Sequence, residues 1–223
     1  MVTVSHIVKK LIDRKPIFYD AICNKIVSFA NLASNLKPDI EAELGKEINE
    51  QAIVMALRRY SETIKKKEDI KGFKYNSEII MKTGLVDITF VKSPSLLKSL
   101  RKIYELIDFE KGDTLNVIHG NYEITMVVSE KYSKKILEIL NEEKMLNLQE
   151  NLVSLAMSFS KDFLYTPGIL SKVTRQLFWD NINVFENIST MTELIFIIDK
   201  KDTMRAFQAL ERLIDGKEKN RRR

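Results

Sequence analysis

The chain has 223 residues, of which 44% are hydrophobic and 30% are charged. This balance is that of a folded globular protein, and it excludes an intrinsically disordered chain. The longest apolar runs have the length of a strand, far below the roughly 18 apolar residues that a membrane-spanning helix needs. No basic segment followed by an apolar block opens the sequence, so we expect no secretory signal. We therefore expect a cytoplasmic protein with no membrane partner.

The net charge of +5 is distributed unevenly. Residues 1–72 hold 13 Lys or Arg against 10 Asp or Glu, and residues 216–223 hold five cations against one acid. The segment between them carries about two net negative charges. A basic start and a basic tail permit contact with nucleic acid but do not require it.

Residues 1–67 show helical periodicity throughout, with apolar side chains recurring every three or four residues. Pro16 is expected in the first turn of a second helix. A short helix is predicted over residues 29–36, and Pro38 is expected to begin another that stops at Gly45. Asn49 is the expected N-cap of the last helix, which extends to Ile64.

A charged run at residues 65–69, followed by Gly72, has no apolar periodicity and predicts a linker. We therefore expect a helical domain over 1–67, a linker over 68–76, and two further units over 77–148 and 149–215. A basic tail over 216–223 completes the chain.

The two further units repeat one order of elements: strand, helix, two strands, helix. In the first unit these are predicted at 85–90, 94–106, 115–118, 122–128 and 132–140. In the second the strands are predicted at 152–159, 182–184 and 194–198, with one helix opening at 167–170 and another at 203–214, and the offsets are roughly 67 to 73 residues.

This order, completed by one more strand, makes a ferredoxin-like βαββαβ unit, in which an antiparallel sheet carries both helices on one face. The expected fold class is α+β: a helical domain followed by two such units. The first unit can take its last strand from residues 145–148, but only a charged tail follows Ile214. We therefore expect the strand-like residues 77–81 to cross over and complete the sheet of the second unit.

The sequence around Pro167-Gly168, together with Asn181-Ile182-Asn183-Val184 and the strand at 193–198, resembles an ACT domain. It is most similar to the second of the paired ACT domains in the regulatory part of aspartate kinases. The resemblance covers residues 152–214 well and residues 84–148 weakly. It implies amino-acid binding where the loop after the first strand meets the second strand, at an interface between two ACT units. It also implies a homodimer; the alternative is that the two units of one chain pair with each other.

A Pro-Gly turn at a helix start also leaves backbone N–H groups free to bind a carboxylate without a cationic side chain. The residues expected to bind the ligand are Thr166, Pro167, Gly168, Ile169, Leu170, Asn181, Ile182 and Asn183. The alternative is that Pro-Gly only forms a turn and that the asparagines only begin a strand, with no ligand bound by either. In the first unit Ser95 follows Pro94 where the glycine belongs, so we expect that unit to act as a pairing partner.

The helical domain resembles a winged helix-turn-helix, with residues 29–36 as the packing helix and 49–64 as the recognition helix. A similar architecture occurs in predicted archaeal regulators of amino-acid metabolism and, loosely, in arginine repressors. The resemblance implies DNA contact by Asn49, Glu50, Gln51, Arg58 and Arg59. Nearby acids such as Glu41, Glu43 and Glu47 oppose DNA, and a helical protein-interaction domain fits the same residues.

No constellation of catalytic residues is present. His6 and His119 have no neighbouring Cys or paired acids for a zinc site, and no Gly-rich phosphate loop occurs, so no metal or cofactor is expected. The single Cys23, near Ile22 and Ile26, is expected to be a buried small hydrophobe.

Two further interpretations concern the second unit. Trp179 and the adjacent Phe178 are expected in the core or in an interface. The acids Glu193, Asp199 and Asp202 are expected to be caps rather than metal ligands.

The sequence thus favours a protein that is not an enzyme: an amino-acid-sensing regulator, in the first place of transcription. The alternative is a non-catalytic regulatory subunit or assembly module for an amino-acid biosynthetic enzyme, without DNA binding.

Overall fold

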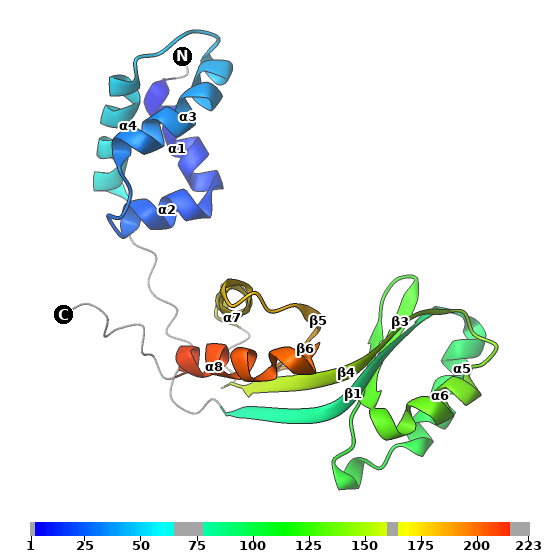
Figure 1. Cartoon of the computed structure of the whole chain (residues 1–223). Coiled ribbons are helices and arrows are strands. Elements are labelled where there is room, and N and C mark those ends of the chain that lie inside the picture. Colours follow the sequence, from blue (N-terminus) through cyan, green and yellow to red (C-terminus); the bar gives the residue numbers. More distant parts are fainter. Residues whose placement is uncertain (1–2, 65–77, 160–164, 215–223) are drawn as a thin grey trace. The chain divides into compact units, whose positions relative to one another are not determined.

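The computed structural model describes residues 3–64, 78–159 and 165–214 (Figure 1). They form two units, a helical unit and a sheet unit, each of which is described by itself. A four-helix region precedes two βαββαβ-like units in one antiparallel sheet, so the predicted fold class is confirmed. The predicted linker at 68–76 and the tail at 216–223 lie outside the described residues. No helix in the described part of the chain is long and apolar enough to cross a membrane.

The helical unit consists of α1 (Val4–Arg14), α2 (Pro16–Cys23), α3 (Phe29–Leu44) and α4 (Glu50–Thr63). Three of the local predictions are confirmed. Pro16 lies in the first turn of α2, and Gly45 ends α3 in the left-handed region with φ of 69°. The side chain of Asn49 caps α4 by accepting a hydrogen bond from the Gln51 N–H.

Pro38 does not begin a new helix, because α3 continues through it from Phe29 to Leu44. The predicted break was wrong for a reason of packing. Leu32, Leu36 and Ile40 keep one buried stripe on both sides of the proline. Burial of that stripe outweighs the hydrogen bond that a proline removes from a helix interior.

Over the residues that the structure describes, the sheet unit contains ten further helices and strands, with 3₁₀ turns between some of them. They are β1 (Ile79–Val91), α5 (Pro94–Leu106), η1 (Phe109–Lys111), β2 (Leu115–His119), β3 (Glu123–Ser129), η2 (Glu130–Tyr132), α6 (Ser133–Ile139), β4 (Met145–Ser158), α7 (Ile169–Trp179), β5 (Val184–Ser189), β6 (Glu193–Asp199), η4 (Lys200–Asp202) and α8 (Thr203–Ile214). The six strands form one sheet in the order β2-β3-β1-β4-β6-β5, and every neighbouring pair is antiparallel.

The two long central strands, β1 and β4, are shared between both halves of the sheet. Ile79 to Lys82 of β1 pair with Met157 to Ser154 of β4, beside β6. The later part of β1 pairs with β3 on one side and with the start of β4 on the other. The register shifts where the strands pass from one half to the other, at Gly84 (φ 68°) and Asn151 (φ 58°), as in β-bulges.

Each half of the sheet has its own helix-covered core. α5 and α6 pack on side chains such as Val86, Ile88 and Phe90, and α7 and α8 pack on Val153 and Leu155. Figure 1 shows the two helix pairs at opposite ends of the β1–β4 pair.

A third buried cluster consists of Leu85, Val127, Leu152 and Ile197, to which Phe185 of β5 adds. It lies on the other face of the sheet, because Leu85 and Leu152 alternate with the helix-facing Val86 and Val153. The centre of the sheet is therefore buried on both faces.

Candidate ligand site at the start of α7

The first turn of α7 begins at the predicted Pro167-Gly168 corner. Gly168 is the N-cap residue, with φ of 86° in the region that favours glycine, and no side chain caps this end within the described residues. Its carbonyl accepts the Lys172 N–H at 3.0 Å. Ile169 is buried and anchors the turn, whereas Gly168 and Leu170 are exposed. The helix start is therefore open to solvent, and its backbone N–H groups suit a carboxylate.

The end of β5 lies at the same edge of the sheet as the end of β4. β5 and β4 are both antiparallel to β6, so they run in the same direction. The Phe159 N–H at the end of β4 donates to the Thr192 carbonyl at 2.7 Å, in the turn between β5 and β6. Ser189 at the end of β5 and Thr190, which follows the strand, are thus the polar residues nearest to this edge. Both residues belong to the segment that resembles an ACT domain, but they were not among the residues expected to bind the ligand, although the first and second strands run parallel in every βαβ unit.

Asn181, Ile182 and Asn183 lie at the opposite end of α7 from Gly168. The helix between them has 11 residues, which corresponds to about 16 Å at 1.5 Å per residue. The eight residues predicted as one ligand site are therefore separated into two groups in the chain. The reason is topological. The helix after the first strand returns the chain to the opposite end of the strands, where the second strand begins.

The asparagine group lines a cavity of about 380 Å³, together with Phe178, Lys201, Asp202 and Arg205. Both cations of this cavity are paired. Lys201 lies 3.0 Å from the Asp199 carboxylate, and Arg205 forms an ion pair with the buried Asp202. The pairing leaves little net charge with which to attract an anion.

The predicted capping role of Asp199 is confirmed. Its Oδ1 accepts the Lys201 backbone N–H at 2.9 Å, and this hydrogen bond lowers the pKa of the Asp199 carboxyl. Within the described part of the chain no group of three His, Cys, Asp or Glu side chains is arranged to hold a metal ion.

Phe178 and Trp179 are 72% and 66% exposed, and their rings meet edge to face at 5.8 Å. The interpretation as core residues was wrong, because the buried stripe of α7 consists of Ile169, Val173 and Leu177. A role in an interface stays a prediction.

The corresponding helix start in the first unit is closed by the protein itself. The Ser93 hydroxyl caps α5 by accepting the Leu96 N–H at 2.9 Å, and it donates to Glu143 Oε2 at 2.6 Å. This hydrogen bond from Ser93 lowers the pKa of the Glu143 carboxyl. A carboxylate of the chain thus lies beside the start of α5, with Ser95 hydrogen-bonded to Ser93 at 3.0 Å.

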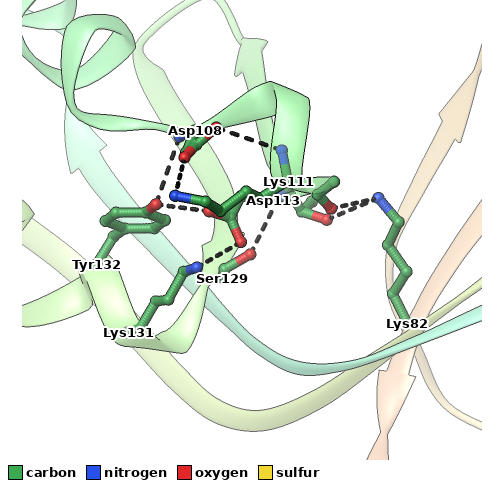
Figure 2. A network of polar contacts seen from close by, with 9 residues as sticks. Lys82, Asp108, Lys111, Asp113, Ser129, Lys131 and Tyr132 are labelled. Atoms are coloured by element: carbon green, nitrogen blue, oxygen red, sulfur yellow. Dashed lines mark hydrogen bonds and ion pairs between the residues drawn. The ribbon is translucent and has the colours of Figure 1, made fainter.

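A second polar cluster fixes the connection from α5 to β2 (Figure 2). The Tyr132 hydroxyl donates to Asp113 at 2.5 Å, and the Lys131 ammonium lies 2.7 Å from the same carboxylate. Lys82 of β1 donates to the Gly112 carbonyl at 3.0 Å. The hydrogen bond from Lys131 is the main cause of the lowered pKa of Asp113. We interpret this network as structural, because its cations and carboxylates satisfy one another.

Two acidic side chains of the sheet carry raised pKa values. Asp87 of β1 is only 3% exposed, and burial raises the pKa of its carboxyl against a weak hydrogen bond from Thr89 at 3.4 Å. Burial also raises the pKa of Glu186 on β5, with further contributions from the charges of Asp87 and Glu123. Asp87 and Glu186 come from β1 and β5, which are not neighbours in the sheet.

The residues predicted to contact DNA are only partly available for it. The Asn49 side chain is engaged as the cap of α4, and Glu50 accepts a hydrogen bond from the Ser34 hydroxyl at 3.2 Å. Gln51, Arg58 and Arg59 are exposed. Over the described residues no strand of the helical unit forms a wing after α4, so DNA contact stays a prediction.

No family model matches this sequence, and no curated protein matches it. Among solved structures, the aspartokinase alpha and beta subunits match with a TM-score of 0.51 and 16% identity, over 61% of this chain and 97% of theirs. The regulatory subunit of aspartate kinase from Thermus flavus matches with 0.50 and 13%, over 65% of this chain and 98% of that subunit.

Aspartate kinase from Synechocystis matches with 0.52 and 15%, over 61% of this chain but only 26% of that enzyme. At these identities the likeness shows the fold: the sheet unit has the fold of the regulatory region of aspartate kinases.

Proposed function

We propose that this chain is a non-catalytic regulatory protein that senses an amino acid through the start of α7 and acts on an amino-acid biosynthetic enzyme. The ligand carboxylate binds the first-turn N–H groups after Gly168, flanked by Thr166, Pro167, Ile169 and Leu170. In a homodimer the second ACT-like unit of each chain faces another such unit, which encloses the ligand.

The difference between the two helix starts carries this proposal. At α5 the Ser93 hydroxyl accepts the Leu96 N–H and donates to the Glu143 carboxylate, so side chains of the protein itself engage the helix start. At α7 the N-cap residue is Gly168, which has no side chain, and this corner is exposed. The chain itself supplies a carboxylate to the first unit and leaves the second for a ligand. The likeness to a regulatory subunit of aspartate kinase supports the same interpretation.

A thermal-shift screen of the full chain against the twenty amino acids tests the proposal. A ligand at 100 times its Kd stabilises the folded state by about 2.7 kcal/mol, which is a readily measured increase in Tm. The absence of a shift with all twenty at millimolar concentration would contradict amino-acid sensing.

Two glycine variants separate ligand loss from backbone strain. Gly168→Ala and Gly45→Ala both place an alanine in the left-handed region, at φ of 86° and 69°, so each has a similar backbone cost. We expect Gly168→Ala to reduce the ligand-induced shift and Gly45→Ala, in the helical unit, to preserve it. If the ligand raises the Tm of both variants equally, Gly168 is not part of the ligand site.

The second candidate, transcription regulation, is favoured by the adjacent exposed Arg58 and Arg59 on α4. Gel-shift binding to duplex DNA over a range of salt concentrations distinguishes the two. If both arginines contact phosphates, the affinity for DNA should fall as the salt concentration rises. The double variant Arg58→Ala/Arg59→Ala should then bind DNA more weakly. Absence of binding at low salt leaves the enzyme-directed function.

A further inference from the structure

We infer that the helical unit has a binding site of its own for a small apolar carboxylate, in a cavity between the end of α2 and the end of α4. The cavity has a volume of about 440 Å³, within the roughly 300–1,000 Å³ that small-molecule sites occupy. This inference concerns the helical unit alone, so it is independent of amino-acid binding at α7.

The wall of this cavity is mainly apolar. Ile22, Val27, Phe29 and Ile64 line it, and the thiol of the half-buried Cys23 adds a further weakly polar surface. Ile22 is buried, whereas the other residues of the wall are partly or fully exposed, so the cavity is open to solvent. The lining therefore suits an aliphatic chain or a ring rather than a fully polar ligand.

Lys25 is the one cation among the residues that line this cavity. No ion pair within the described part of the chain engages its ammonium group, in contrast to Lys201 and Arg205 in the cavity beside α8. The Ser61 hydroxyl is already engaged, because it donates to the Arg58 carbonyl at 2.7 Å. Lys25 is exposed, so its side chain can extend to a carboxylate bound in the cavity.

The backbone of Lys25 gives independent support. The N–H of Ile26 donates to the Ala21 carbonyl and that of Lys25 to the Ile22 carbonyl, each at 3.0 Å, which makes a Schellman motif at the end of α2. Lys25 is the left-handed residue of this motif, with φ of 56°, where glycine is usual. A lysine in this conformation has a backbone cost that a glycine would not have, and binding of a carboxylate would offset that cost.

Cys23 makes the inference testable, because it is the only cysteine in the sequence and lines the cavity. The test measures the rate at which iodoacetamide alkylates Cys23 in the full chain, with octanoate as the probe and 1-octanol as the matched compound without a carboxylate. At ten times its Kd, octanoate should slow alkylation roughly ten-fold. 1-Octanol should protect Cys23 less well.

Lys25→Gly is the decisive variant, because it should raise the Tm of the protein and at the same time lower its affinity for octanoate. Glycine relieves the left-handed strain, so the Tm should rise, while affinity for octanoate should fall roughly ten-fold and that for 1-octanol should not change. Lys25→Asn, which also tolerates this conformation, should behave alike in binding, and Lys46→Ala serves as the control for loss of a charge elsewhere.

Two outcomes would overturn the inference. One is that octanoate does not protect Cys23 at millimolar concentration. The other is that protection by octanoate equals that by 1-octanol or survives both Lys25 variants unchanged.

Discussion

The Ser93 hydroxyl donates a 2.6 Å hydrogen bond to the Glu143 carboxylate while it caps the first turn of α5. One side chain thus joins the start of a helix to the segment just before β4. The equivalent N-cap of α7 is Gly168, which has no side chain to make either contact. The repeated units therefore differ at the position where the proposed ligand binds.

We expect Ser93→Ala to lower the free energy of unfolding by about 1 kcal/mol, because the mutation removes the hydroxyl that caps α5. Urea denaturation followed by circular dichroism measures the change. Ser171→Ala, at an exposed position inside α7, serves as the control and should change the free energy of unfolding by no more than about 0.5 kcal/mol. Equal effects of both mutations would contradict the capping role.

Glu143 should make the stability of the folded state depend on pH in the acidic range. Its folded-state pKa is lowered from 4.5 by the hydrogen bond from Ser93, so the folded state favours the ionised carboxylate. The stabilisation is present above pH 4.5 and is lost as the pH falls through the lowered pKa. Glu143→Gln should reduce this part of the Tm–pH profile, and an unchanged profile would contradict the prediction.

Asp87 should have the opposite pH dependence. Burial raises its folded-state pKa above 3.8, so the protonated form is favoured in the folded state. Its contribution to stability is present below pH 3.8 and is lost as the pH rises through the raised pKa. We expect Asp87→Asn to raise the Tm near pH 7 and to have little effect at pH 3. A lower Tm at neutral pH would show that the carboxylate is needed.

Tyr132 should stabilise the α5–β2 connection through its hydroxyl group. Tyr132→Phe removes the hydrogen bond to Asp113 (Figure 2) and should lower the free energy of unfolding by about 1–2 kcal/mol. Tyr104→Phe, on the exposed side of α5, is the matched control and should be near neutral. Chemical denaturation of both variants decides whether the network contributes.

Pro38→Ala should stabilise the helical unit. Alanine restores a backbone N–H inside α3 and removes the steric conflict of the proline ring, which together are worth up to about 3 kcal/mol in a helix interior. The stiffer unfolded chain of the proline form offsets part of this gain. Thermal unfolding measures the gain, and a decrease in Tm would contradict the prediction.

Local features of this fold could be predicted from the sequence because their causes lie within a few residues. Pro16, Gly45 and Asn49 act on the adjacent turn of helix, and the repeated order of strands and helices follows from apolar periodicity. The contrast between Pro94-Ser95 and Pro167-Gly168 could also be predicted, because it lies in the chain itself.

Tertiary structure decided what depends on residues far apart in sequence. It continued α3 through Pro38, because a buried stripe outweighs one lost hydrogen bond. It also placed Asn181 to Asn183 about 16 Å from Gly168, because the length and direction of α7 set that separation.

The partner of each Ser and each carboxylate, such as Glu143 for Ser93, likewise emerges only when strands and helices pack. Sequence periodicity specifies which face of an element is buried. Only packing specifies which other element covers it, since the hydrophobic effect has no direction of its own.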